Sequence, residues 1–270
     1  MIVVLYCTLM SETYPVILLE RKAENLRKQT GNKALRSKLT SELSPAVVIR
    51  RGIERPMKLL VLSPIVLALS VFQGICFGCL YLLFTTFSEV FTKQYRWSTG
   101  SDGLSFMGLG VGMALSLVFF GRYSDPLAKR LAGKGEIKPE YRLVPMIPAT
   151  LLITGGLFWY GWSIQAGAHW IVPILGTGLV GFGYMPVILA IMTYLVDAFE
   201  EWAASAMAAS TILRSIMGAL IPLAGESMYD AMGYGWGNSL LGFITLAMLP
   251  FPTLFYMYGE RMRKSRKLDL

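Results

Sequence analysis

Charged residues are scarce in this sequence. Of its 270 residues only 16% are charged, while 54% are hydrophobic, and a soluble domain carries about 25% charged residues. The long stretches without Asp, Glu, Lys or Arg predict that lipid surrounds most of the chain. The formal net charge is +8, but the basic residues lie between the apolar stretches, as in the loops of membrane proteins. We therefore expect no nucleic-acid partner.

Residues that catalyse reactions or bind metals are also few. The chain has one histidine, His169, and three cysteines, Cys7, Cys76 and Cys79, which all lie in apolar stretches. No Gly-x-Ser-x-Gly segment and no phosphate-binding Walker A motif is present. The sequence therefore predicts no disulfide framework, no metal site, no organic cofactor and no enzymatic activity.

Six uncharged runs are long enough to cross a hydrocarbon core, which needs about 20 residues. The third and fourth runs are continuous, and we divide them at residues 163–169, where Gln165 and Gly167 interrupt the apolar pattern. The predicted fold class is all-α, a polytopic membrane bundle of six transmembrane helices. The predicted spans are 59–87, 103–121, 143–162, 170–196, 203–225 and 231–259.

The distribution of Lys and Arg predicts the orientation. One side holds 11 of them in residues 20–58, 6 in 122–142 and 5 in the tail, whereas the other side holds only Lys93 and Arg96. By the positive-inside rule the richer side is cytosolic. The predicted organisation is a remnant of a preceding transmembrane helix at 1–19, a cytosolic linker at 20–55, the six-helix bundle at 56–259 and a basic cytosolic tail at 260–270.

Arg214 is the only charged residue in the middle of a predicted span. Inserting an arginine there costs about 2.5 to 3.5 kcal/mol, so its side chain should face the bundle interior or a water-filled cavity. Two readings stay open. Arg214 either contacts substrate or a gate, or it pairs with Asp197, Glu200 or Glu201 and joins two helices.

Two predicted spans carry polar and aromatic residues on one face. Gln73, Phe77 and Tyr81 recur every four residues, which places an amide, a ring and a phenol on one side of a helix. The fourth span combines several glycines with Tyr184 and Pro186, a pattern that permits close packing and bending at mid-membrane depth. These residues either line a cavity or simply pack between helices.

Three long segments resemble one family. They are SETYPVILLERKAENLRKQTGN at 11–32, RPMKLLVLSPIVLALSVF at 55–72 and YLVDAFEEWAASAMAASTILRS at 194–215. They are similar to the major facilitator superfamily, specifically to fungal twelve-spanner drug:proton antiporters that include polyamine and multidrug exporters. The resemblance implies a C-terminal half, equivalent to helices seven to twelve plus a remnant of the sixth.

The segment GRYSDPLAKR at 121–130 resembles a degenerate second copy of the superfamily's loop motif. In the family this loop braces the cytosolic gate, so the resemblance implies that Asp125 accepts hydrogen bonds from a helix N-terminus and that the basic pair reaches acidic groups. The sequence departs from the motif at Pro126 and Ala128. The implied gate-loop residues are Gly121, Asp125, Lys129 and Arg130.

The resemblance also implies a function. We expect a proton-coupled secondary transporter of amphipathic or cationic small molecules, drugs or polyamines, in the plasma membrane, with the proton gradient as the coupling ion and no cofactor. Its partners would be the lipid bilayer, a small-molecule substrate and a missing N-terminal half. The alternative is a truncated, non-transporting remnant or an interaction subunit that pairs with another half. The predicted cavity and coupling residues are Gln73, Phe77, Tyr81, Tyr184 and Arg214.

Overall fold

Every regular element in the described part of the chain is a helix, which confirms the all-α prediction. The chain divides into two compact units, Met1–Arg51 and Gly52–Leu270. The first unit contains α2 (Pro15–Thr30), and α3 (Pro45–Leu62) runs across the division. The computed structural model describes residues 15–32, 34–37, 45–98, 100–133, 135 and 138–265.

The second unit is the membrane bundle. Six helical segments in the described residues are long and apolar enough to cross a bilayer, as predicted. Short 3-10 helices precede three of the long helices. They are η1 (Asp102–Phe106), η2 (Pro139–Leu143) and η3 (Glu200–Trp202). The long helices are α4 (Pro64–Tyr95), α5 (Met107–Ala132), α6 (Met146–Gln165), α7 (Ile171–Phe199), α8 (Ala203–Leu223), α9 (Gly225–Ala247) and α10 (Pro250–Ser265).

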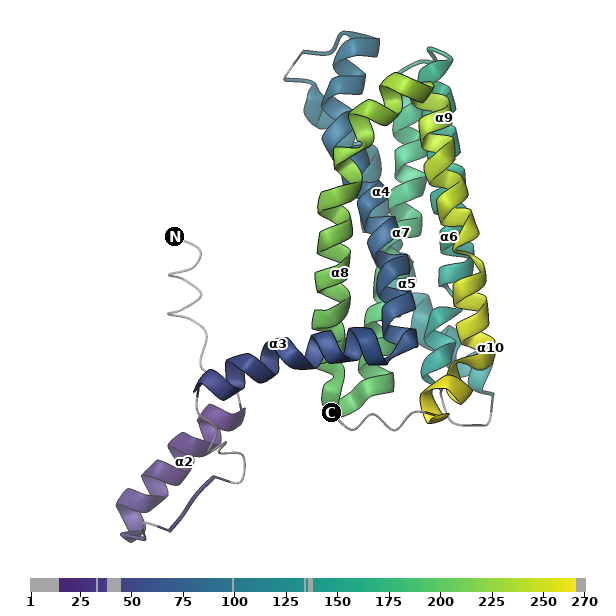
Figure 1. The fold of residues 1–270 in the computed structure, drawn as a ribbon. Helices are drawn as coiled ribbons and strands as arrows, with labels where there is room; N and C mark the ends of the chain where they lie inside the picture. Colours follow the sequence, from purple (N-terminus) through teal and green to yellow (C-terminus); the bar gives the residue numbers. More distant parts are fainter. Residues whose placement is uncertain are drawn as a thin grey trace. The chain divides into compact units, whose positions relative to one another are not determined.

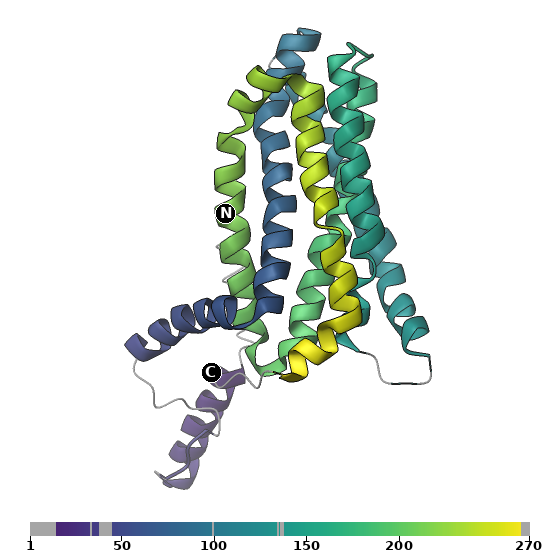
Figure 2. The same cartoon turned by 45° about the vertical axis from the view of Figure 1, so that its right-hand side comes forward.

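The bundle is built from helices that run side by side. α4 packs along α8, α7 packs along both α5 and α6, and α6 packs along α9, an arrangement visible in Figures 1 and 2. α4 is the most buried of the spanning helices, whereas α5 and α8 are the least buried. α5 and α8 therefore expose a larger share of their residues than the other spanning helices.

The first spanning helix begins later and ends later than predicted. Ser63 caps α4, because its side chain accepts a hydrogen bond from the backbone N–H of Val66 at 3.4 Å, and Pro64 occupies the first turn. Leu59 belongs to α3 instead. The helix ends at Arg96, which adopts the left-handed conformation with φ 53°. The predicted limits of 59–87 were wrong because they followed apolarity, and a cap can begin a helix within an apolar run.

The segment predicted as a loop at 122–142 is partly helical. α5 continues past Gly121 and includes the whole GRYSDPLAKR segment, so the predicted gate loop is a helix end and not a loop. Its C-terminal cap is Gly133, whose φ is 59°. Charged residues mark where a helix leaves the hydrocarbon, but the helical backbone conformation can continue beyond that point.

The last predicted span is a kinked pair of helices. The helical segment begins at Gly225, six residues before the predicted start, and Gly233 interrupts it with φ 73° and ψ 171°. Only glycine adopts this conformation without strain. A second break separates α9 from α10, which continues to Ser265.

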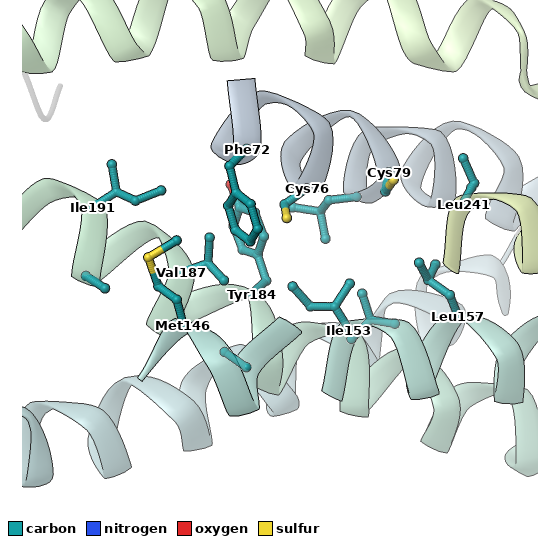
Figure 3. Packing of buried hydrophobic residues seen from close by; sticks show 14 of the residues in the cluster. Phe72, Cys76, Cys79, Met146, Ile153, Leu157, Tyr184, Val187, Ile191 and Leu241 are labelled. Atoms are coloured by element: carbon teal, nitrogen blue, oxygen red, sulfur yellow. The ribbon is translucent and has the colours of Figure 1, made fainter. Parts of the chain in front are cut away.

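The hydrophobic core lies between α4, α6 and α7. Large side chains of α4 such as Phe72 and Phe87 are fully buried, as is Tyr160 of α6. Some polar groups inside the bundle pair across helices, as with the hydroxyls of Thr154 on α6 and Thr245 on α9 at 2.9 Å. Figure 3 shows the central packing of Phe72, Cys76, Cys79, Met146, Ile153, Leu157, Tyr184, Val187, Ile191 and Leu241.

Glycines set the contact between α5 and α7. A Cβ atom at Gly108 would lie 2.1 Å from the carbonyl oxygen of Ile174, and one at Gly112 would lie 2.0 Å from that of Gly178. The two backbones therefore touch directly, which is how small residues join membrane helices. Any larger residue at these positions must separate the helices.

The predicted domain limits remain predictions. Residues 1–14 and 266–270 lie outside the described residues, and so does most of the predicted helix remnant. Residues 15–19 form the first turns of α2, together with residues predicted for the linker.

Candidate functional site

The structure brings four of the predicted cavity residues into one cluster on α4, α7 and α8. The rings of Phe77 and Tyr81 lie 4.4 Å apart between centroids, and those of Phe77 and Tyr184 lie 6.3 Å apart. The Cζ atom of Arg214 lies 4.5 Å from the centre of the Phe77 ring, a cation–π contact. Phe77 is thus the centre of a cluster with residues from three helices.

Gln73, the fifth predicted residue, lies one helical turn from Phe77 and contacts the same helix, α8. The hydroxyl of Ser210 donates to Oε1 of Gln73 at 2.6 Å. The Gln73 side chain is fully buried, and its Nε2 atom has no hydrogen-bond partner among the described residues. An amide N–H left without an acceptor inside a membrane protein is costly.

α8 presents its small and polar residues to α4 at intervals of four. Ser210, Arg214 and Gly218 are spaced in this way, so they lie on one face. A Cβ atom at Gly218 would lie 2.6 Å from Cδ1 of Phe77. The glycine therefore leaves room for the ring that contacts Arg214.

Arg214 has no carboxylate partner among the described side chains. Asp197, one of the predicted partners, accepts a hydrogen bond from Nε of Arg142 at 3.1 Å instead. The side chain of Glu201 lies outside the described residues. The Nε atom of Arg214 is buried without a hydrogen-bond partner in the described chain. The predicted pairing of Arg214 with Asp197 is therefore wrong, and Glu200 forms no ion pair with it in the described chain. No described side chain compensates the positive charge of the cluster.

The Tyr184 hydroxyl belongs to the same cluster. It is buried next to the Arg214 guanidinium but forms no hydrogen bond of good geometry in the described chain. Arginine offers only donors. The phenolic O–H is therefore buried and has no acceptor in the described chain.

A charge network lies at the predicted cytosolic end of the bundle. Arg142 of η2 donates from Nη1 to Asp125 of α5 and from Nε to Asp197 of α7. Asp125 therefore pairs with an arginine and not with a helix N-terminus, which corrects that expectation. Arg142 was not among the predicted site residues, although its position beside an apolar run was a usable signal.

The other implied gate residues do not join this network. The described chain shows no ion pair for Lys129 or Arg130, and a Cβ atom at Gly121 would meet nothing within 4 Å. A pocket of about 230 Å³ includes Asp125 and Arg142 in its lining, which otherwise comes from α5, α7 and Pro145, the residue before α6. Its lining includes Pro186, the predicted bending point of α7.

Comparison with known proteins identifies the family. A protein-family model described as Major Facilitator Superfamily matches residues 2–222, which is most of the chain. The chain belongs to the major facilitator superfamily. Membership in a family whose curated relatives are transporters also confirms that the chain is not an enzyme.

The superfamily relatives are fungal. The MFS-type transporter atr4 of Stereocaulon alpinum is 51% identical over 96% of this chain and 47% of its own length. The MFS-type transporter penM of Penicillium rubens is 50% identical over 96% of this chain and 51% of its own length. The MFS transporter cpaT of Aspergillus oryzae is 46% identical, over 99% and 54%. The chain thus spans about half the length of the curated relatives it matches, and no solved structure matches it.

Proposed function

We propose that this chain forms the C-terminal half of a proton-coupled secondary transporter for amphipathic small molecules such as drugs. The observation that carries the proposal is the cluster around Phe77, in which unsatisfied polar atoms and aromatic rings lie on three spanning helices. Intramembrane ionisable residues without a structural partner indicate a substrate or ion pathway.

The exposed faces of the bundle fit a second half. α5 and α8 are the least buried spanning helices, and Tyr81 on α4 is 41% exposed although it belongs to the cluster. We place the other half against these helices, so that the cluster becomes one wall of a cavity between the halves. In transporters built from two repeats, substrate binds at such an interface near the middle of the membrane.

Proton coupling belongs to the other half in this proposal. The centres of the six predicted spans contain no Asp or Glu, and the Asp125–Arg142 pair lies at a bundle end. A carboxylate that takes up and releases a proton during transport must therefore come from elsewhere. We place the assembled transporter in the plasma membrane, with its basic tail in the cytosol.

An export assay with a completed transporter tests the proposal. The part of atr4 that this chain does not match is fused ahead of it and expressed in yeast, and cells are loaded with a cationic rhodamine dye or with anionic carboxyfluorescein. We expect faster export of one dye than with an empty vector, and loss of that export when the proton gradient is collapsed. Cells that express each half alone are the matched controls. Export at the empty-vector rate by a fusion that reaches the plasma membrane would refute the proposal.

The alternative is a non-transporting remnant or an interaction subunit, and the half-length match favours considering it. The fusion with the unmatched part of atr4, in cells where it reaches the plasma membrane, decides between the two roles. Export above the empty vector would exclude a remnant. Absence of export, combined with co-purification of the chain with a separate half, would favour an interaction subunit.

A further inference from the structure

The unsatisfied polar atoms of the cluster can all donate a hydrogen bond. Gln73 offers an amide N–H, Tyr184 a phenolic O–H and Arg214 a guanidinium N–H, and none of them has an acceptor in the described chain. Of the three, only the phenolic oxygen can also accept. We call these three residues the donor cluster. The only acceptor of the Gln73 side chain is already occupied by Ser210.

The donor cluster lies within a small region. Gln73 and Phe77 are one helical turn apart on α4, and Ser210 and Arg214 are one turn apart on α8, so the two facing pairs are stacked about 5.4 Å apart along the helices. Tyr184 approaches from α7, with its ring 6.3 Å from that of Phe77. The three donors therefore lie in one small region between α4, α7 and α8, where Gln73 and Tyr184 are buried and Arg214 is partly exposed.

The sign of the charge decides which molecule fits. A cationic drug or polyamine at this site would lie beside a guanidinium that no described carboxylate neutralises, in a low-dielectric environment where like charges repel strongly. A carboxylate or similar anion would instead accept from the guanidinium, the phenol and the amide. Arginine binds carboxylates with paired, charge-assisted hydrogen bonds.

We infer that the donor cluster binds an acidic amphipathic small molecule, whose anionic group accepts hydrogen bonds from Arg214 and Tyr184 while its apolar body lies on Phe77 and Tyr81. This inference rests on the proposed function, because it names the substrate class of the same site. It replaces the cationic and polyamine classes that the family resemblance implied.

A binding experiment on the whole chain in nanodiscs of zwitterionic phosphatidylcholine tests the inference. The tritiated probes share one ring system and differ in charge: naphthylacetate, naphthylacetamide and naphthylethylammonium. Equilibrium dialysis measures each affinity, and empty nanodiscs correct for partition into lipid. We expect naphthylacetate to bind at least about tenfold more tightly than naphthylethylammonium.

Substitutions at Arg214 test the cause of the preference. Arg214→Gln should reduce the preference for the anion by about tenfold, and binding of naphthylacetamide that remains in this variant shows that the site is folded. If Arg214→Gln binds no probe, Arg214→Lys decides, since it keeps the charge and should keep the preference. Arg122→Gln, at an exposed position of α5, is the matched control and should bind as the parent does.

Three results would overturn the inference: equal or tighter binding of the cation, an anion preference that survives in Arg214→Gln, or no binding of any probe to the parent chain. The export assay separates this failure from failure of the proposed function. Acid-selective binding without export by the fusion would support the donor cluster and refute transport. Export of the rhodamine dye without any preference for the acid would do the reverse.

Discussion

Replacement of Gly112 by alanine should disrupt the contact between α5 and α7. The new Cβ atom would lie 2.0 Å from the carbonyl oxygen of Gly178 and 2.9 Å from its carbonyl carbon. A carbon and a carbonyl oxygen pack at about 3.3 Å or more, so the helices must separate by more than about 1 Å. Both contacting groups are backbone atoms, and no side-chain rotation can relieve the clash.

The expected cost follows from this geometry. Overpacking a rigid site costs up to about 3 kcal/mol, and the higher helix propensity of alanine returns about 1 kcal/mol. The net destabilisation is then about 2 kcal/mol, which lowers the unfolding temperature of a chain of this size by about 4 to 8 °C. Gly110 is the matched control, because it lies in the same helix and a Cβ atom there meets nothing within 4 Å. Gly110→Ala should therefore unfold at or above the parent temperature.

Thiol labelling provides the assay. Cys76 and Cys79 are buried in α4 and react with a maleimide dye only when the bundle unfolds. Cys7 lies outside the described residues and is replaced by serine in every variant. The temperature at which fluorescence rises reports unfolding in detergent or nanodiscs. If Gly112→Ala unfolds at the same temperature as Gly110→Ala, the argument that backbone contact joins α5 to α7 is refuted.

The same assay checks three further predictions. Arg142→Gln removes two partly exposed ion pairs. It should destabilise the bundle by about 1 kcal/mol and lower the unfolding temperature by about 2 to 4 °C, and the effect should be smaller at high salt. A temperature shift that does not change with salt would contradict this prediction. Gly121→Ala should have no destabilising effect, since its Cβ atom meets open space, and a clear loss of stability would show that the motif glycine has a steric role here. Thr154→Val removes one buried hydroxyl contact between α6 and α9 and should cost about 0.6 kcal/mol, whereas a loss several times larger would mean that Thr245 depends on it.

The number of spanning segments and their helical conformation could be predicted from composition, but the residues at which several helices begin and end could not. Apolar runs report which residues lie in hydrocarbon, whereas helix ends depend on caps and backbone conformation. Ser63 followed by Pro64 was a readable start signal for α4. The kink at Gly233 was not readable, because an isolated glycine in a helical pattern is usually tolerated.

In the candidate site, the arrangement of residues within one helix could be predicted, but contacts between helices could not. Spacing alone placed Gln73, Phe77 and Tyr81 on one face, since a helix repeats every 3.6 residues. Nothing in the spacing predicts that Arg214 lies over Phe77, because that contact depends on how α8 crosses α4. The pairing of Arg142 with Asp125 likewise joins segments whose sequences do not indicate each other.

Arg214 links stability to function in this bundle. Its charge costs about 2.5 to 3.5 kcal/mol on insertion, and a cation–π contact such as that with Phe77 returns about 0.5 to 2 kcal/mol. No described carboxylate offsets the insertion cost that remains after this contact, whereas the charges of Asp125 and Arg142 offset each other. If this position served packing alone, an apolar side chain of the same size would make the bundle more stable. The arginine is therefore explained best by a partner from outside this chain, which is the role that the proposed acidic substrate fulfils.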